Sequence, residues 1–270
     1  MKKLLTVLFA LCMILSLAGC AKKEEPAPAP AFDPSAKSEG VMTYAEFAAA
    51  PLDSEVVIEG FVQAAQSYWN GAKLYVEDPD GAYFVYCDGK GEDVNISEDD
   101  FAKVVVSTDY SDGWVGKGSG AKVQVKGTKS EWSGEVEISY ATVTVLDSDT
   151  WFAQAEDVTA LLGKDELADK MNRFVKFSNM TVEPSKAADG SEVAFLYNWD
   201  GSGTPGNDIY FNVSVDGQIY NFTVESYLAY DGSDVYEAAE ALNIGDVVDL
   251  EGFLYWYNGA NPHITAITVK

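Results

Sequence analysis

The chain of 270 residues is poor in histidine, and this shortage excludes several kinds of active site. His263 is its only histidine, so no metal site built from several histidines can form. A Ser-His-Asp triad would have to use His263, and no nucleophile-elbow motif accompanies it. We therefore expect no enzyme, with no catalytic residue, no cofactor and no metal site.

Cysteine is also scarce, with only Cys12, Cys20 and Cys87 in the chain. Cys12 lies in an apolar leader and Cys20 stands at its end, which leaves Cys87 alone in the remainder of the chain. No intramolecular disulfide is then available. Cys87 follows Tyr86 in an apolar, strand-like segment, and this position favours a buried small hydrophobic residue over a reactive thiol.

Basic residues are few: 18 Lys and Arg stand against 43 Asp and Glu, for a net charge of −25. Nucleic-acid binding normally depends on Lys and Arg that neutralise phosphates, so a surface this acidic makes nucleic acid an improbable partner. The same charge opposes direct contact with an anionic membrane face. Solubility at a salty cell surface accounts for the acidic balance without any specific use of it.

A long apolar run is absent as well, because the run from Leu4 to Ala18 is too short for a spanning helix of about 20 residues. It follows a basic start and ends in small residues, as a processed leader does. Leu17-Ala18-Gly19-Cys20 resembles the lipobox of bacterial lipoproteins. The resemblance implies cleavage before Cys20, a diacylglycerol on its sulfur, and attachment to the extracytoplasmic face of the cell membrane through this lipid alone. A plain secretory signal with a chance cysteine is the alternative.

These features divide the N-terminal part of the chain into a lipoprotein signal peptide at 1–19 and a lipid anchor with a flexible linker at 20–40. The linker is rich in proline and alanine and low in apolar bulk, so it cannot bury enough surface to fold by itself.

One sequence frame occurs twice in the remainder of the chain. Gly120 and Gly127 stand seven residues apart with alternating apolar residues between them, and Gly245 and Gly252 repeat this spacing. Each copy predicts a strand with a glycine kink, then an aromatic-rich turn and a return strand, at 135–145 and 263–269. Two copies indicate one architectural unit used twice.

The first unit places three predicted strands before a helix and two strands after it. A capping box at Thr43 starts a short helix, and the strands follow at 56–62, 73–77 and 82–87. A second helix, capped at Ser97, precedes the Gly120 hairpin. This order resembles the OB-fold, a five-stranded Greek-key barrel. The segments 44–47, 80–86 and 131–138 are similar to a family of bacterial extracellular OB-fold-like domains of unassigned function, which implies a fold and no activity.

The second unit repeats the order with more divergence. Helical apolar spacing over 157–170, interrupted at Gly163, predicts a helical connector. Strands are expected at 174–182 and 194–198, then a hairpin over 209–224 and a helix over 234–242. We therefore expect a mainly β protein with two tandem OB-fold-like five-stranded Greek-key barrels and short helices. The domains are 41–150 and 171–270, joined by a helical connector at 151–170.

Carboxylates are abundant, so single pairs carry little weight. Glu135 and Glu137 lie on the same side of a strand by alternation, and a solvated face explains them better than acid/base chemistry. Residues 198–208 partly match a calcium-binding loop, but Ile209 stands where a bidentate Glu is needed. A polar turn is favoured there, and weak calcium binding stays open.

The candidate ligand site is aromatic. In an OB barrel the loops between strands 1 and 2 and between strands 4 and 5 flank the ligand face. Here those loops hold Tyr68, Trp69, Asn70 and Trp132 in the first unit and Tyr255, Trp256, Tyr257 and Asn258 in the second. Rings beside amides suit the faces of sugars and also stack bases. The alternative is that these rings only pack the hairpins.

Our leading hypothesis is a non-enzymatic, lipid-anchored extracytoplasmic binding or adaptor protein, whose partner is an extracellular ligand or protein. The first alternative is capture of an oligosaccharide or cell-wall glycan through the loop aromatics. The second is a nucleic-acid-binding or nuclease-accessory module, which rests on analogy of fold.

Overall fold

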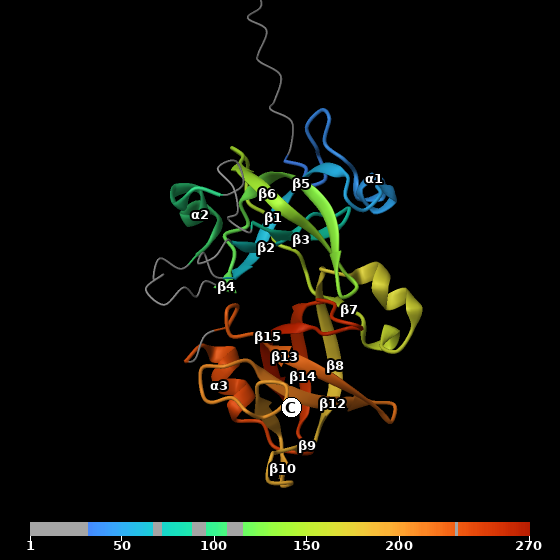
Figure 1. The fold of residues 1–270 in the computed structure, drawn as a ribbon, viewed down its shortest axis with the longest axis vertical. Helices are drawn as coiled ribbons and strands as arrows, with labels where there is room; N and C mark the ends of the chain where they lie inside the picture. The colour runs from blue at the N-terminus through green and yellow to red at the C-terminus, as the bar shows by residue number, and fades with distance from the viewer. Residues whose placement is uncertain (1–31, 67–71, 88–95, 107–115, 230–231) are drawn as a thin grey trace, which may run out of the picture. The chain divides into compact units, whose positions relative to one another are not determined.

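The structure, a computed structural model, describes residues 32–66, 72–87, 96–106, 116–229 and 232–270 (Figure 1). Residues 33–270 form one compact unit. The sheets divide into two groups of strands that correspond to the two predicted barrels. Among the described helices, none has the length and apolar character needed to cross a membrane.

The first barrel has the strand order of an OB-fold. Its five strands are β1 (Glu55–Gln66), β2 (Lys73–Glu77), β3 (Ala82–Tyr86), β5 (Lys122–Trp132) and β6 (Glu135–Val145). They close in the order β1-β2-β3-β6-β5-β1, with β3 and β6 parallel and the other pairs antiparallel. Helix α1 (Tyr44–Ala49) precedes β1, helix α2 (Glu98–Val104) lies between β3 and β5, and the short β4 (Gly116–Lys117) pairs with β1. The predicted fold class is confirmed.

The second barrel repeats this order. Its strands are β8 (Phe174–Glu183), β12 (Ile209–Val215), β13 (Gln218–Val224), β14 (Val247–Phe253) and β15 (His263–Val269). They close as β8-β12-β13-β15-β14-β8, again with one parallel pair, β13 and β15. Helix α3 (Asp234–Glu240) lies between β13 and β14. The remaining strands are β7 (Glu156–Asp157), which pairs with β8, and the short β9 (Ser185–Lys186) and β10 (Glu192–Val193), which pair with each other.

Two details of the second unit differ from the sequence prediction. The strand expected at 194–198 is β11 (Phe195–Tyr197), an addition at the margin of the sheet, and the second barrel strand is β12. The connector consists of two 3-10 helices, η1 (Thr159–Leu161) and η2 (Asp165–Lys170), instead of one longer α-helix. Gly163 lies between them with φ of 75°, a left-handed conformation that ends a helix.

The second glycine of each repeated frame lies where the paired strand approaches closely. A Cβ at Gly127 would stand 2.6 Å from Ile138 Cγ2, and a Cβ at Gly252 would stand 2.2 Å from the carbonyl oxygen of His263. Both positions coincide with a shift of register between the paired strands, so only glycine permits the bend. The two predicted hairpins are therefore confirmed. Their turns differ, because Ser133 and Gly134 form a two-residue turn with positive φ, whereas residues 254–262 make a longer loop.

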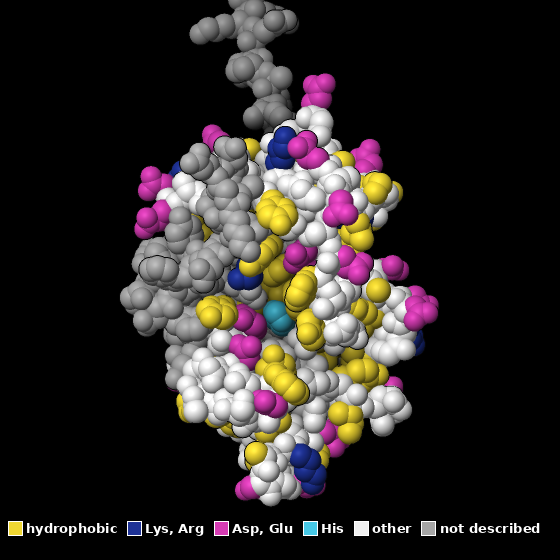
Figure 2. Space-filling model, viewed as in Figure 1, with side chains coloured by type: hydrophobic (Ala, Val, Ile, Leu, Met, Phe, Trp, Pro, Cys, Tyr) yellow, Lys and Arg dark blue, Asp and Glu magenta, His cyan; other side chains and the backbone are white. Residues whose placement is uncertain are grey.

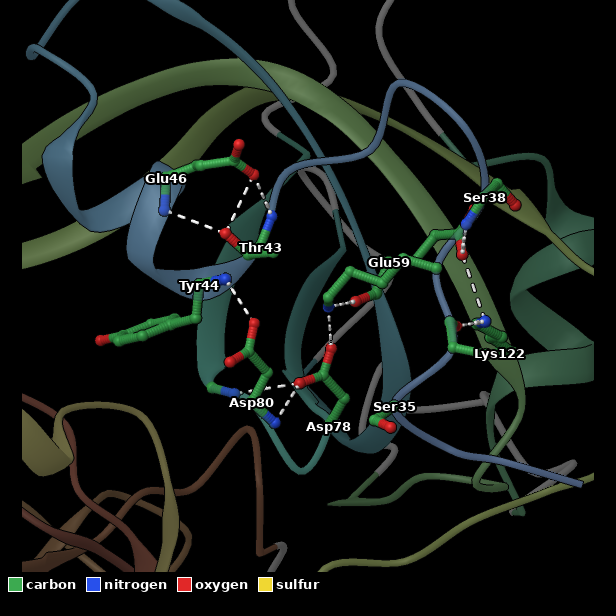
Figure 3. Close-up of polar contacts among 12 residues, drawn as sticks. Ser35, Ser38, Thr43, Tyr44, Glu46, Glu59, Asp78, Asp80 and Lys122 are labelled. Atoms are coloured by element: carbon green, nitrogen blue, oxygen red, sulfur yellow. Dashed lines mark hydrogen bonds and ion pairs between the residues drawn. The ribbon is translucent and has the colours of Figure 1, made fainter.

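The last part of the predicted linker is attached to the first barrel (Figure 3). Glu59 is fully buried and accepts hydrogen bonds from the Ser38 N–H and from Gln124, each at 3.1 Å, and it pairs with Lys122 at 3.1 Å. Burial alone would raise the pKa of Glu59, but these donors hold it below its ordinary value. Lys37 forms an ion pair with Asp78, so residues 33–40 are held at two points.

The two barrels contact each other through an apolar cluster. Ala64, Tyr75 and Phe84 of the first barrel pack with Leu228 and Phe253 of the second. Tyr75 and Phe253 stack with ring centroids 4.3 Å apart.

An ion pair lies beside this cluster. Arg173 of the second barrel contacts Glu77 of the first at 3.2 Å, and the Phe174 N–H donates to the same carboxylate at 2.8 Å. The contacts between the barrels therefore combine apolar packing with specific hydrogen bonds.

Candidate ligand-binding site

A cavity of about 440 Å³ lies over the outer side of β2 and β3 and is bounded by both barrels. Its lining residues are Gln66, Lys73, Phe84, Tyr86, Trp132, Glu137, Glu225, Tyr255 and His263. Figure 2 shows a hollow on this face with the one histidine of the chain at its bottom. Hydrophobic side chains gather along the edges of the hollow, and acidic side chains lie beside it.

Strand register builds the floor of the cavity. Gln66 of β1 pairs with Lys73 of β2, and Lys73 pairs with Tyr86 of β3, so the three residues form one row across the sheet. Alternation places Phe84 on the same side of β3 as Tyr86, while Val85 points into the barrel core. In an OB-fold, this face of strands 2 and 3 is the one that binds ligands.

Trp132 forms part of the rim from the end of β5, next to the turn that joins strands 4 and 5 of the first barrel. Its side chain is 62% exposed. The second barrel supplies the facing wall through Tyr255 and His263, whose rings stack at 4.4 Å, and Tyr255 also meets Phe84 edge-on at 5.3 Å. The aromatic surfaces of the two barrels therefore converge on one space.

His263 is only 7% exposed, and its Nδ1 lies 2.8 Å from the Tyr75 hydroxyl. Burial lowers the pKa of His263 to about 3, so the ring is neutral at physiological pH. Since Nδ1 is occupied by Tyr75, Nε2 is the ring nitrogen that remains for a ligand. The position of His263 in the cavity wall carries no signal in the sequence, where it is one residue of an alternating final strand.

Burial shifts the pKa values of the charged side chains in the cavity. It raises the pKa of Glu225 to about 8, and the nearby Asp208 acts in the same direction. Burial also raises the pKa of Glu137 and lowers that of Lys73. In each of these groups burial disfavours the charged form.

Gln66 is a further polar group of the cavity lining. The residue is 5% exposed, and its amide makes no hydrogen bond to any other residue that the structure describes. The sequence analysis did not identify Gln66, since a lone glutamine at the end of a strand carries no motif.

The predicted site residues separate into two groups. Trp132 and Tyr255 both line the cavity, as just described. Trp256 lies against the hairpin of the first barrel, because a Cβ at Gly134 would be 2.9 Å from its indole ring. Tyr257 and Asn258 are exposed and do not line the cavity, and the Asn258 N–H donates to the Ser133 carbonyl at 2.7 Å. Tyr68, Trp69, Asn70 and Cys20 lie outside the described residues.

The solvated-face interpretation of Glu135 and Glu137 is wrong for Glu135. Glu135 is fully buried, and its carboxylate accepts the Trp256 N–H at 2.8 Å. The reason is the second barrel, which covers this side of β6. Alternation along β3 places Phe84 and Tyr86 on one face, and alternation along β6 places Glu137 on the face of Glu135. The sequence of a single strand does not show which of its faces another part of the protein covers.

Metal-ligand groups are absent from the described part of the chain, where no three His, Cys, Asp or Glu side chains lie close enough together to hold an ion. Asp208, in the loop that partly matches a calcium site, accepts hydrogen bonds from the Ser226 N–H at 2.8 Å and from its hydroxyl at 2.6 Å. Cys87 is fully buried in the core of the first barrel, as predicted.

No protein-family model matches the chain, and neither does any curated protein. Among solved structures, the tetrameric p202 HIN2 is 12% identical with a TM-score of 0.32, over 82% of this chain and 96% of its own. A murine DNA-binding protein bound to double-stranded DNA is 8% identical with a TM-score of 0.30, over 80% and 94%. A deletion variant of the single-stranded-DNA-binding protein from Thermus aquaticus is 13% identical with a TM-score of 0.23, over 80% and 93%. Similarities this weak establish neither a family nor a ligand.

Proposed function

We propose that the chain is an extracytoplasmic, lipid-anchored binding protein that captures a carbohydrate in the cavity between its two barrels. The observation that carries this proposal is the cavity itself, which lies on the ligand face of an OB barrel and joins aromatic rings to buried polar groups. Its volume of about 440 Å³ is in the range of small-molecule sites, roughly 300–1,000 Å³.

Sugars fit this combination of groups better than other ligands do. The apolar faces of sugar rings pack on aromatic rings, and Trp132, 62% exposed, offers such a ring at the rim. Sugar hydroxyls both donate and accept hydrogen bonds, as does the amide of Gln66, and the Glu225 carboxyl offers acceptor oxygens. Because burial disfavours the charged forms of Glu225 and Lys73, the cavity also favours an uncharged ligand.

Nucleic acid is a weaker candidate for this site. Among the described residues of the cavity lining, Lys73 is the only cation, and the whole chain carries a net charge of −25. Binding to a phosphate backbone needs several Lys or Arg contacts. The aromatic rings would allow bases to stack, but nothing in the cavity neutralises the phosphates that accompany them.

Only the leader and Cys20 support the proposal of a lipid anchor. Growth of cells that express the chain with a labelled fatty acid tests it, because the label enters only a lipidated cysteine. The wild-type chain should carry the label and sediment with membranes. A Cys20→Ser variant should lose both properties, and label that persists in this variant would overturn the anchor.

The binding function is tested by titration of the purified chain, without its leader, against a panel of neutral oligosaccharides. Calorimetry and tryptophan fluorescence report binding independently. Trp132→Ala should weaken binding by roughly 5- to 150-fold, since stacking of one ring contributes about 1–3 kcal/mol by analogy with bases. Trp199→Ala is the matched control, because Trp199 is 76% exposed and lies outside the cavity lining. Absence of binding across the panel, or equal losses in the two variants, would overturn the proposal.

A further inference from the structure

A second cavity, of about 580 Å³, lies beside the contact between the barrels. It shares no described lining residue with the first cavity, although the apolar cluster between the barrels borders both. Phe84 of this cluster lines the first cavity. Ala64, Leu228 and Phe253 of the same cluster line the second. The volume is again in the range of small-molecule sites, roughly 300–1,000 Å³, and the carbohydrate proposal leaves this space without a ligand.

The interior of the second cavity is apolar and buried, and its mouth is apolar and exposed. Ala64, Leu228 and Phe253 are 3%, 5% and 4% exposed, whereas Phe152 and Val106 are 43% and 58% exposed. Apolar surface that a ligand removes from water contributes about 25 cal/mol per Å² to binding. The cavity therefore suits a ligand whose apolar part enters it.

The neutral polar side chains of the described lining are occupied or covered. The Gln63 Oε1 accepts the Ala153 N–H at 2.9 Å, and its Nε2 donates to a backbone carbonyl of its own strand at 2.9 Å. The Thr265 hydroxyl donates to the Glu251 carbonyl at 3.5 Å. The Ser233 hydroxyl is covered by protein atoms, so a ligand in the cavity does not contact it. None of these groups anchors a polar ligand inside the cavity.

Lys117 is the charged residue of the described lining. Strand register pairs it with Ala64, so the two side chains lie on the same face of the sheet. Lys117 is exposed, and its Nζ lies 5.9 Å from the centroid of the Phe152 ring at the mouth. It forms no ion pair within the described part of the chain, although Asp and Glu outnumber Lys and Arg by 43 to 18. Its charge is therefore available to a ligand.

We propose that the second cavity binds an amphiphile with a single alkyl chain and an anionic head group. The alkyl chain packs on the buried apolar side chains, and the head group contacts the Lys117 Nζ at the mouth. The acidic chain as a whole repels anions, but salt screens charges that lie beyond about 8 Å at physiological ionic strength, so the adjacent lysine dominates. The inference goes beyond the carbohydrate function and does not depend on it, because the two cavities share no described lining residue.

The test compares decanoate with decanol, which have the same alkyl chain and differ in the charge of the head group. We expect calorimetry to show that the wild-type chain binds decanoate roughly three- to fivefold more tightly, which corresponds to about 0.7–1 kcal/mol and lies in the range of an exposed ion pair. Lys117→Met keeps the apolar stem and removes the charge. It should reduce decanoate binding to the level of decanol and leave decanol binding unchanged. Lys126→Met is the matched control, because Lys126 is exposed on β5 and lies outside the cavity lining.

A second variant establishes where the probes bind. Ala153 lines the cavity and is 8% exposed, so Ala153→Phe should fill the cavity and abolish binding of both probes. Thermal unfolding establishes that each variant is folded. If Ala153→Phe does not fold, Phe152→Ala replaces it, and the loss of this wall should weaken both probes.

Three results would overturn the inference. Equal binding of the two probes to the wild type, or equal losses of decanoate binding in Lys117→Met and Lys126→Met, would show that Lys117 does not recognise the head group. Wild-type affinity for decanoate in Ala153→Phe would place the amphiphile elsewhere. Absence of binding by both probes would show that the cavity holds no amphiphile. None of these results bears on the carbohydrate site, which Trp132→Ala tests separately.

Discussion

The hydroxyl of Tyr75 and Nδ1 of His263 lie 2.8 Å apart, although the two residues are 188 positions apart and belong to different barrels. Both side chains are buried, and the ring of Tyr75 also stacks on Phe253. This hydrogen bond fixes the orientation of His263 and therefore the direction of its other ring nitrogen. The same hydrogen bond therefore joins the two barrels and positions His263 in the cavity wall.

Loss of this hydrogen bond should destabilise the protein. Tyr75→Phe keeps the ring but leaves Nδ1 of His263 buried without its partner, so we expect a loss of about 1–3 kcal/mol in the free energy of unfolding. Urea denaturation followed by fluorescence measures this change. Tyr140→Phe removes an exposed hydroxyl from β6 and should change stability by less than about 0.5 kcal/mol. Equal stabilities of the two variants would show that the contact contributes nothing.

Lys129 should be a stabilising residue in spite of its charge. It is buried, and its Nζ donates to the carbonyls of Phe47, Ala48 and Ala50 at 3.0, 2.9 and 2.8 Å, at the C-terminal end of α1. A cation there satisfies carbonyls that the helix leaves unpaired and opposes its negative dipole end. We expect Lys129→Met to cost about 2 kcal/mol in urea denaturation.

Lys126 provides the comparison for Lys129, because it lies on the same strand, is exposed, and pairs only with the exposed Glu55 at 3.1 Å. Exposed ion pairs contribute roughly 0–1 kcal/mol, so Lys126→Met should change stability little. If the two methionine variants unfold at the same urea concentration, the three hydrogen bonds of Lys129 make no net contribution to the free energy of unfolding.

Stability should fall as the pH rises through neutrality. Burial raises the pKa of Glu135 to about 8 from an ordinary value of 4.5, so folding favours the protonated acid. This contribution is complete below about pH 4.5 and is lost as the pH rises through about 8. Glu77, with a pKa raised to about 7 by burial, and Glu225 have the same sign. We expect the Tm to decrease between pH 6 and pH 9.

Glu135→Gln tests the share of this slope that belongs to Glu135, since its amide stays neutral at every pH. Between pH 6 and pH 9 the Tm of the variant should fall less than the Tm of the wild type. A difference of 1 kcal/mol in the free energy of unfolding corresponds to roughly 2–4 °C in Tm for a chain of this size. Glu131→Gln changes an exposed carboxylate on the same hairpin and should keep the wild-type slope. A Glu135→Gln variant with an unchanged slope would contradict the assignment.

The barrels could be predicted from the sequence because their strands and helix ends are specified by residues close together in the chain. Glycine spacing, alternation and the caps at Thr43 and Ser97 describe hairpins and helix ends without reference to distant residues, and both caps are present in the structure. The second barrel strand was misplaced because residues 195–197 and 209–215 both have strand-like composition, and only pairing with β8 distinguishes the barrel strand.

The site was only half predictable. Trp132 and Tyr255 follow from the positions of the loops in an OB barrel, which each barrel defines by itself. Glu225 and His263 enter the cavity because the second barrel packs on the ligand face of the first, a contact between residues that are far apart in the chain. The same packing buries Glu135 and turns Trp256 into a contact of the hairpin. No periodic pattern records such a contact.

The central claim, that the face of β2 and β3 in the first barrel holds the ligand, is tested most directly by amide hydrogen exchange with and without a saturating concentration of the oligosaccharide that binds most tightly in the titration panel. The account predicts slower exchange at Lys73–Glu77 and Ala82–Tyr86 and at the Trp132 end of β5, with unchanged exchange at the equivalent strands Ile209–Val215 and Gln218–Val224. Slower exchange at the equivalent strands of the second barrel, or no change anywhere at a concentration where calorimetry detects binding, would contradict it.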